Sequence, residues 1–84
     1  MTVLSYPQIP TYRVIQTEVA DEDGILYPTY GIEAIDQNGN ILRQIPDISL
    51  SEPAVTTLAH KMNTHRLALC HFLDVVEDFL EGDF

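Results

Sequence analysis

The dipeptide Asn38-Gly39 constrains the fold of this chain more than any other feature, because it stands between two apolar segments. Asn-Gly is the preferred pair for a two-residue type I′ turn, which joins two antiparallel strands into a hairpin. The segment before it, residues 25–36, places apolar side chains on both of its faces at a period of two, as a strand does. The chain is therefore predicted to return as an antiparallel strand over residues 41–45, where Pro46 ends the regular pairing.

A further strand is predicted over residues 12–20, where β-branched and aromatic side chains are frequent. The sequence Asp21-Glu22-Asp23-Gly24 is typical of the turn that would connect it to the next strand. Inside that next strand, Pro28 has no backbone N–H to donate, and so predicts a sheet edge or a bulge. Gly31 likewise predicts a bulge or a close approach of another segment.

Two helices are predicted in the rest of the chain. Ser51 is a good N-cap for the first helix. The apolar residues of this helix recur at the spacing i, i+3, i+4, i+7 and are Val55, Leu58, Ala59 and Met62. Asn63 is expected at its end in the left-handed conformation. A second amphipathic helix is predicted from about Leu69 to Glu81, and Gly82 ends it.

Strands followed by helices define an α+β fold. The expected architecture is a three-stranded antiparallel meander followed by two helices packed on one face of the sheet. Residues 1–11 are expected to form an extended N-terminal arm, and residues 12–84 a single domain. The other face of the sheet then carries isoleucine and tyrosine side chains that are solvated, folded over by the arm, or paired with another subunit.

The charge of the chain limits its partners. Four lysines and arginines oppose thirteen aspartates and glutamates, so the formal net charge of the 84 residues is −9. Such acidity argues against binding to nucleic acid and against docking on an anionic membrane. Neither a signal peptide nor a transmembrane helix is predicted, because no long apolar run is present. Since Cys70 is the one cysteine, no intramolecular disulfide can form, and a cytoplasmic protein is expected.

The second predicted helix carries the candidate partner-binding residues. These are Asp74, Glu77, Asp78 and Glu81, on the face opposite the apolar residues. This face either contacts a basic partner or is only solvated. It does not offer the loop that gathers the roughly six to eight oxygen ligands of calcium.

The histidines and the cysteine form no recognisable catalytic or metal site. His60 and His65 are five residues apart, whereas Cys70 and His71 are adjacent, so neither pair has the spacing of a zinc site. A nucleophile made of Cys70 and His71 has no other hydrolase residues around it, and the isolated glycines form no phosphate-binding loop. The sequence therefore predicts no metal, no cofactor and no enzymatic activity.

A set of short motifs is spread over residues 12–80. They are Tyr30-Gly31-Ile32, Asp47-Ile48-Ser49, Asn63, Leu67, His71 and the run Asp74-Val75-Val76-Glu77-Asp78-Phe79-Leu80. Together they resemble a family of small bacterial proteins, mainly from Gram-positive Firmicutes, that is known only as a domain of unknown function. This chain has Arg66 where a glycine is expected, and Ala68-Leu69 where a small polar cap and a proline are expected. The resemblance implies no activity, substrate or cofactor, and it supports a bacterial, cytosolic protein.

These observations predict a small acidic cytosolic protein that is a non-enzymatic protein-interaction or regulatory module. Its unknown protein partner would bind the acidic helix face. A self-assembling homodimer is an alternative, formed through the uncovered face or the edge of the sheet. A second alternative is an acidic mimic of nucleic acid, although mimics spread their acids over an extended surface and here the acids are clustered.

Overall fold

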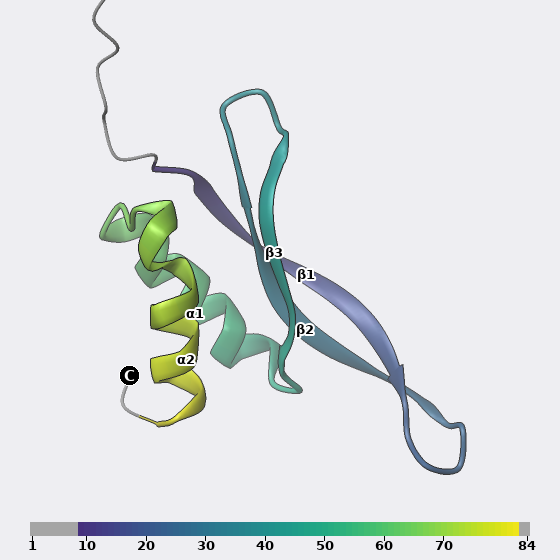
Figure 1. The fold of residues 1–84 in the computed structure, drawn as a ribbon. Coiled ribbons are helices and arrows are strands. Elements are labelled where there is room, and N and C mark those ends of the chain that lie inside the picture. The colour runs from purple at the N-terminus through teal and green to yellow at the C-terminus, as the bar shows by residue number, and fades with distance from the viewer. Residues whose placement is uncertain (1–8, 83–84) are drawn as a thin grey trace, which may run out of the picture.

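Three antiparallel strands precede two helices along the chain, and both helices lie on one side of the sheet (Figure 1). The structure, a computed structural model, describes residues 9–82. The strands are β1 (Thr11–Ala20), β2 (Leu26–Ile35) and β3 (Ile41–Ser49), paired in the order β1-β2-β3. The helices are α1 (Glu52–Thr64) and α2 (Phe72–Leu80), with a 3₁₀ turn, η1 (Leu69–His71), directly before α2. The predicted α+β fold is therefore confirmed, whereas residues 1–8 of the predicted N-terminal arm lie outside the described residues.

Strand β2 is the centre of the sheet and divides its side chains between two faces. Tyr12 and Val14 of β1 pair with Ala34 and Ile32 of β2, respectively. These four residues share the face that packs against the helices, where Ile32 and Ala34 are fully buried. Ile15 pairs with Gly31 on the opposite face, against which neither helix packs (Figure 1).

The β2–β3 hairpin turns through a three-residue loop. The Asp36 N–H donates to the Asn40 carbonyl at 3.0 Å, so residues 37–39 form the loop between them. Gly39 has a φ of 84°, whereas Asn38 has no positive φ. The predicted two-residue type I′ turn is therefore wrong, because it needs a positive φ at both of its positions. The Asp36 carboxylate accepts hydrogen bonds from the N–H groups of Asn38 and Asn40, at 2.8 and 2.9 Å, and these bonds stabilise the longer loop.

Strand β3 bulges where it passes Gly31. The register pairs Ile32–Ile45 and Tyr30–Ser49 are separated by one residue on β2 and by three residues on β3. The extra residues bend β3 over Gly31, whose missing side chain leaves room for the approaching backbone. The predicted bulge or close approach at Gly31 is therefore confirmed.

The bulge also lets β3 continue past its proline. Pro46 lies in the bulge, where no ladder hydrogen bond is needed, so the strand reaches Ser49 and not only the predicted Ile45. The next residue, Asp47, has a φ of 55°. Its Oδ1 accepts a hydrogen bond of 2.6 Å from the hydroxyl of the fully buried Thr29 on β2. This bond stabilises the bulged conformation.

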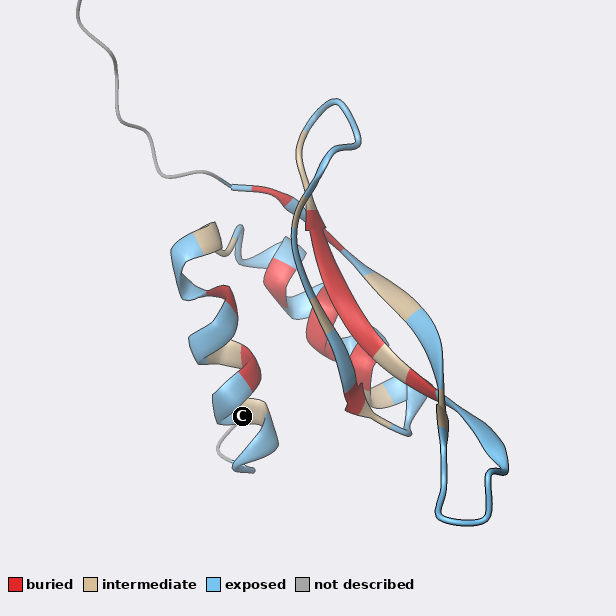
Figure 2. Ribbon diagram, turned by 45° about the vertical axis from the view of Figure 1, so that its right-hand side comes forward, coloured by how far each residue is buried: buried red, intermediate tan, exposed pale blue. Residues whose placement is uncertain are grey.

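Strands β1 and β2 extend beyond β3 as a two-stranded arm. In this part, Pro28 pairs with Glu18 of β1 and has no partner on β3, which confirms its predicted edge position. We call residues 18–28 the hairpin arm. It projects away from the helices (Figures 1 and 2), and its apolar side chains Ile25, Leu26 and Tyr27 are exposed.

Helix α1 ends in a Schellman motif. Ser51 caps its beginning, as predicted, by accepting a hydrogen bond from the backbone N–H three residues later. At the other end, the N–H of Leu67 donates to the Met62 carbonyl at 3.0 Å, and the N–H of Arg66 donates to the Asn63 carbonyl at 3.2 Å. Arg66 has a φ of 52°, so Arg66 and not Asn63 takes the left-handed conformation. The prediction for Asn63 is wrong, since Asn63 lies within the helix.

Helix α2 is shorter than predicted. Residues 69–71 form the η1 turn, and the residue before it, Ala68, has no side chain that could cap a helix. The α-helix runs only from Phe72 to Leu80. Among residues 9–82, no helix combines the length and the apolar character that crossing a membrane requires.

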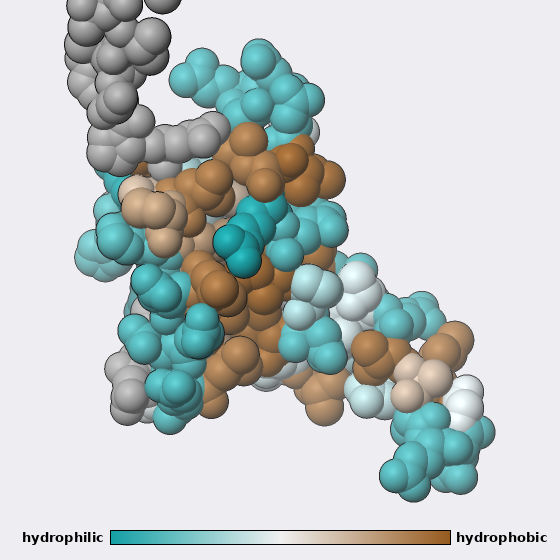
Figure 3. Space-filling view, viewed as in Figure 1, coloured by the Kyte–Doolittle hydropathy of each residue, from teal (hydrophilic) through white to brown (hydrophobic). Residues whose placement is uncertain are grey.

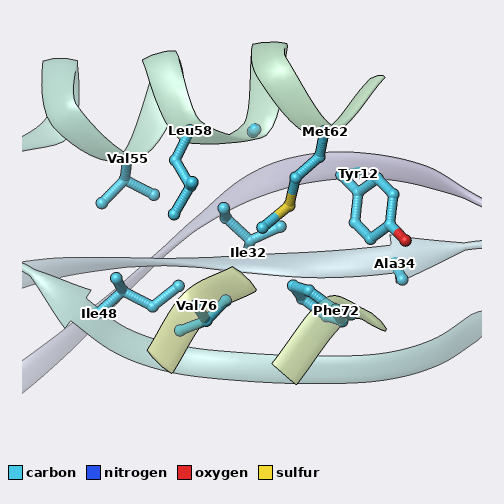
Figure 4. Packing of buried hydrophobic residues seen from close by; sticks show 10 residues of the cluster. Tyr12, Ile32, Ala34, Ile48, Val55, Leu58, Met62, Phe72 and Val76 are labelled. Atoms are coloured by element: carbon cyan, nitrogen blue, oxygen red, sulfur yellow. The ribbon is translucent and has the colours of Figure 1, made fainter. Parts of the chain in front are cut away.

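One hydrophobic core lies between the helices and the sheet. Figure 2 shows the buried residues along β2 and on the inner sides of both helices. Figure 4 shows side chains of α1 on one side of Ile32 and side chains of α2 on the other. The rings of Tyr12 and Phe72 meet edge to face, with their centroids 5.1 Å apart, so β1 and α2 contact each other directly at one end of the core.

Candidate protein-interaction surface

The four acidic residues predicted to bind a partner lie together on the outer side of the molecule. Asp74, Glu77 and Asp78 are on α2, and Glu81 is the C-cap residue just beyond it. All four are exposed, and none of their carboxylates has a hydrogen bond or an ion pair within residues 9–82. The opposite side of α2 carries the fully buried Phe72. We call the four carboxylates the acidic face.

The acidic face is electrostatically unfavourable for α2. The C-terminal end of a helix carries partial negative charge and is stabilised by cations, yet the last turn of α2 has no basic residue. The pairs Asp74–Asp78 and Glu77–Glu81 have the i, i+4 spacing, at which like charges destabilise a helix by about 0.2–0.5 kcal/mol each. Asp74, in the first turn, is favourably placed. The other three acids reduce the stability of α2.

Two exposed leucines lie beside the acidic face. At 100° per residue, Leu73 and Leu80 fall on one side of α2, between the acidic face and the buried Val76. Leu73 is 38% exposed and Leu80 is 60% exposed, although both are large apolar side chains on an element that packs against the core. Glu77 lies four residues after Leu73 and three before Leu80, so it adjoins both leucines.

The two leucines lie on the side of α2 that is turned toward β3. The residues of α2 that line hollows against α1 are Val75 and Phe79, on the other side of the helix, and α2 also contacts β3. Ile45 of β3 pairs with Ile32 and so faces the helices, but it is only half-buried, whereas Ile32 is fully buried. Figure 3 shows apolar residues gathered at the surface between α2 and β3, interrupted by a hydrophilic side chain, with further hydrophilic residues along the outer side of α2. Arg43 pairs with Ala34, so it shares the helix-facing side of β3 with Ile45, and it is exposed. We call this strip of surface, with Leu73 and Leu80 on α2 and Ile45 on β3, the apolar seam.

A shallow groove lies between the two helices. It has a volume of about 340 Å³ and is open to solvent. Its lining is mainly apolar and includes Leu58 of α1 and Phe79 of α2. A smaller, almost wholly apolar pocket of about 170 Å³ lies nearby against Met62 and Val75. Neither hollow brings together the convergent polar groups that orient a small substrate.

The histidines and Cys70, weighed from the sequence as ligands or nucleophiles, do not converge on one site. Within residues 9–82, no three His, Cys, Asp or Glu side chains lie close enough together to hold a metal ion. His60 lies 3.5 Å from the Thr64 hydroxyl on the same helix. Cys70 is exposed beside the buried Tyr12. Burial, followed by the charge of Cys70, raises the pKa of Tyr12 to about 12.

Glu33 is a buried acid that the sequence pattern did not reveal. It is 3% exposed, on the face of the sheet away from the helices, where Arg13 and Gln44 occupy the neighbouring strands. Its carboxylate accepts hydrogen bonds from Gln44 Nε2, at 2.8 Å, and from Arg13 Nε. The Gln44 bond first, and then the Arg13 bond, lower the pKa of Glu33. This row of three side chains joins the strands and contributes to the fold.

Asn63 is a second structural residue whose role was not predicted. Its side-chain amide accepts from the Tyr12 N–H and donates to the Tyr12 carbonyl, both at 2.8 Å, in the way a neighbouring strand would. The Tyr12 hydroxyl in turn donates to the Leu67 carbonyl at 2.7 Å. Asn63, Leu67 and Gly31, all among the residues on which the family resemblance depends, therefore hold the strands and helices together.

The fold and this surface define a small α+β protein with a three-stranded meander, a helical pair and an acidic outer face. Residues 5–82 match the Family of unknown function (DUF6514), and the chain belongs to that family. Comparison with curated proteins found no match, and comparison with solved structures found none either.

Proposed function

We propose that the protein is a non-enzymatic protein-interaction or regulatory module that binds a protein partner through its acidic face. The observation that supports this most is the placement of Glu77, Asp78 and Glu81 at the C-terminal end of α2, where they destabilise the helix. Acids that serve no purpose in the fold, beside exposed leucines, have the composition of a surface that a partner neutralises and covers. The partner is expected to be basic at the contact, and the setting to be the cytoplasm.

Charge reversal on α2 tests this proposal. The double substitution Glu77→Lys with Asp78→Lys removes half of the acidic face. The double substitution Glu22→Lys with Asp23→Lys makes the same chemical change in the loop of the hairpin arm, and so controls for net charge. Both variants and the unchanged protein serve as bait for affinity capture from lysate of the source cells, followed by a binding measurement with each purified partner.

The expected result is a partner retained by the unchanged protein and by the loop variant but lost by the α2 variant. Retention of the same partners by the α2 variant would refute binding through the acidic face. Equal loss with both variants would show that the overall charge, and not this face, is recognised.

Homodimer formation is the second candidate function, and the hairpin arm is the observation that favours it. Ile25 and Leu26 are 62% and 61% exposed, next to Tyr27, on an arm with open strand edges. A dimer predicts a mass in light scattering of twice the 9.5 kDa of one chain, and a return to the monomer mass with Ile25→Lys or Tyr27→Lys. A monomer at high protein concentration would exclude this candidate.

A further inference from the structure

The apolar seam has the spacing of a helix-binding surface. Leu73 and Leu80 are seven residues apart on one side of α2, which corresponds to two helical turns and about 10 Å along the axis. Helices that dock on such a surface present apolar residues at i, i+3, i+4 and i+7, so their contacts repeat over the same length. Ile45 on β3 forms the far side of the seam, since it faces the helices and is only half-buried.

A strand of another chain is a poor occupant for the seam. The seam runs along β3, an edge strand whose backbone could in principle pair with a further strand. The β3 edge is interrupted by two register shifts and by Pro46, which has no N–H to donate. Bulges and prolines of this kind prevent the addition of a strand. A helix, whose backbone hydrogen bonds are satisfied within itself, does not need a regular edge.

A second copy of this chain is also a poor occupant. A two-fold contact through Leu73 and Leu80 would place Glu77, which adjoins both leucines, close to the Glu77 of the other copy. Two chains that each carry a net charge of −9 also repel each other as they approach. Leucines next to the acidic face instead complement a partner that combines apolar and cationic side chains.

We infer that the apolar seam between α2 and β3 binds an amphipathic helix of a partner protein, with its apolar side against Leu73, Leu80 and Ile45 and its lysines or arginines against the acidic face. This inference rests on the proposed function and specifies the partner. The bound helix would lie beside α2 as a third member of the helical layer, over the part of the sheet where Ile45 is half-buried.

Binding of two synthetic peptides tests the inference. The probe peptide is a labelled helix with leucines every three or four residues on one side and lysines on the other. The control peptide has the same composition in an order that spreads the leucines around the helix. Fluorescence anisotropy is measured with the unchanged protein, with Leu73→Ser plus Leu80→Ser, and with Glu77→Gln plus Asp78→Gln. The matched control is Leu26→Ser plus Leu50→Ser, which makes the same change at two exposed leucines outside the seam.

The expected result is that the ordered peptide binds and that both α2 variants weaken it at least about tenfold, whereas the Leu26 and Leu50 variant does not. If only the glutamine variant weakens binding, the apolar seam does not contact the helix and the inference is wrong, whereas binding through the acidic face, the proposed function, is still supported. If only the serine variant weakens binding, the acidic face does not contribute, and the claim that the partner is basic at the contact would be wrong. Equal binding of both peptides, no binding, or no effect of any α2 variant would overturn the whole inference. A dimer that the serine variant dissociates would identify a second copy as the occupant and also overturn it.

Discussion

Strand β2 has two halves that look alike in sequence and differ in the structure. Leu26 and Ile32 are both large aliphatic residues at even positions of the strand, and therefore belong to the same face of the sheet. Ile32 is fully buried beneath the helices, whereas Leu26, in the hairpin arm, is 61% exposed. Figure 2 shows the same contrast between the buried middle of β2 and the exposed arm. The alternating pattern thus identifies a strand and its faces but does not say how much of a face is covered.

The lengths of the elements explain the difference. A strand of ten residues such as β2 spans about 33 Å, because each residue adds about 3.3 Å. A helix of thirteen residues such as α1 spans only about 20 Å. The helices therefore cannot cover the full length of the β1–β2 pair, and the end that projects becomes the hairpin arm.

Gly31→Ala is expected to have the largest effect. A Cβ at residue 31 would lie 2.6 Å from the Cα of Pro46 and still closer to the Ile45 carbonyl oxygen, and both are backbone atoms of the bulge. The free energy of unfolding should fall by about 4 kcal/mol or more, measured by urea denaturation. Gly39→Ala, at a hairpin turn with open space around it, should lose only about 1 kcal/mol through its positive φ. Equal losses would show that β3 can move away from residue 31.

Ile32→Ala tests the contrast within β2 directly. The substitution leaves a cavity between both helices and the sheet, and should lower the free energy of unfolding by about 3 kcal/mol. Leu26→Ala, on the same strand and face, should change it by less than about 0.5 kcal/mol, because Leu26 is mostly exposed already. A large loss with Leu26→Ala in the isolated protein would mean that the arm packs against something in solution, such as a second copy.

Asn63→Ala removes the side chain that protects the edge of β1. The Tyr12 N–H and carbonyl would both lose their 2.8 Å partner in a partly buried position, so stability should fall by about 2 kcal/mol. Hydrogen exchange of the Tyr12 amide should also accelerate, whereas exchange in the hairpin arm should not change. Unchanged exchange at Tyr12 would show that water replaces the asparagine without a penalty.

Glu33 is expected to make the free energy of unfolding depend on pH in the acidic range. Because its pKa is lowered in the folded protein, Glu33 stabilises the fold above its ordinary pKa, and this contribution is lost as the pH falls through the lowered value. Glu33→Gln should therefore reduce the difference in stability between pH 7 and about pH 3, measured by urea denaturation at both. Glu22→Gln, in the loop of the hairpin arm, is the control. The same pH dependence in all three proteins would contradict a role for Glu33.

The strands, the first helix and the position of the acidic face could be predicted because each depends on local spacing. The three-residue loop between β2 and β3 could also have been predicted. An aspartate precedes the loop of each hairpin, Asp21 in one and Asp36 in the other, and its carboxylate accepts hydrogen bonds from two backbone N–H groups two and four residues later. The contact between Asn63 and Tyr12 could not, because the two residues are 51 positions apart. The apolar seam could not be predicted from local sequence spacing either, because it depends on the position of α2 relative to β3.

The smallest expected effect has the opposite sign, at a second place where the chain needs a positive φ. The hairpin arm uses glycine for its turn, with a φ of 78° at Gly24, whereas the end of α1 uses Arg66 with a φ of 52°. An arginine is strained in this conformation, so Arg66→Gly should raise the free energy of unfolding by about 0.5–1 kcal/mol despite the greater freedom of glycine in the unfolded chain. Arg66→Ala removes the same charge but keeps a Cβ, and should give no such gain in urea denaturation. An equal gain with both would assign the effect to the charge. A gain with glycine alone would show that the end of α1 tolerates a backbone strain that the hairpin arm avoids.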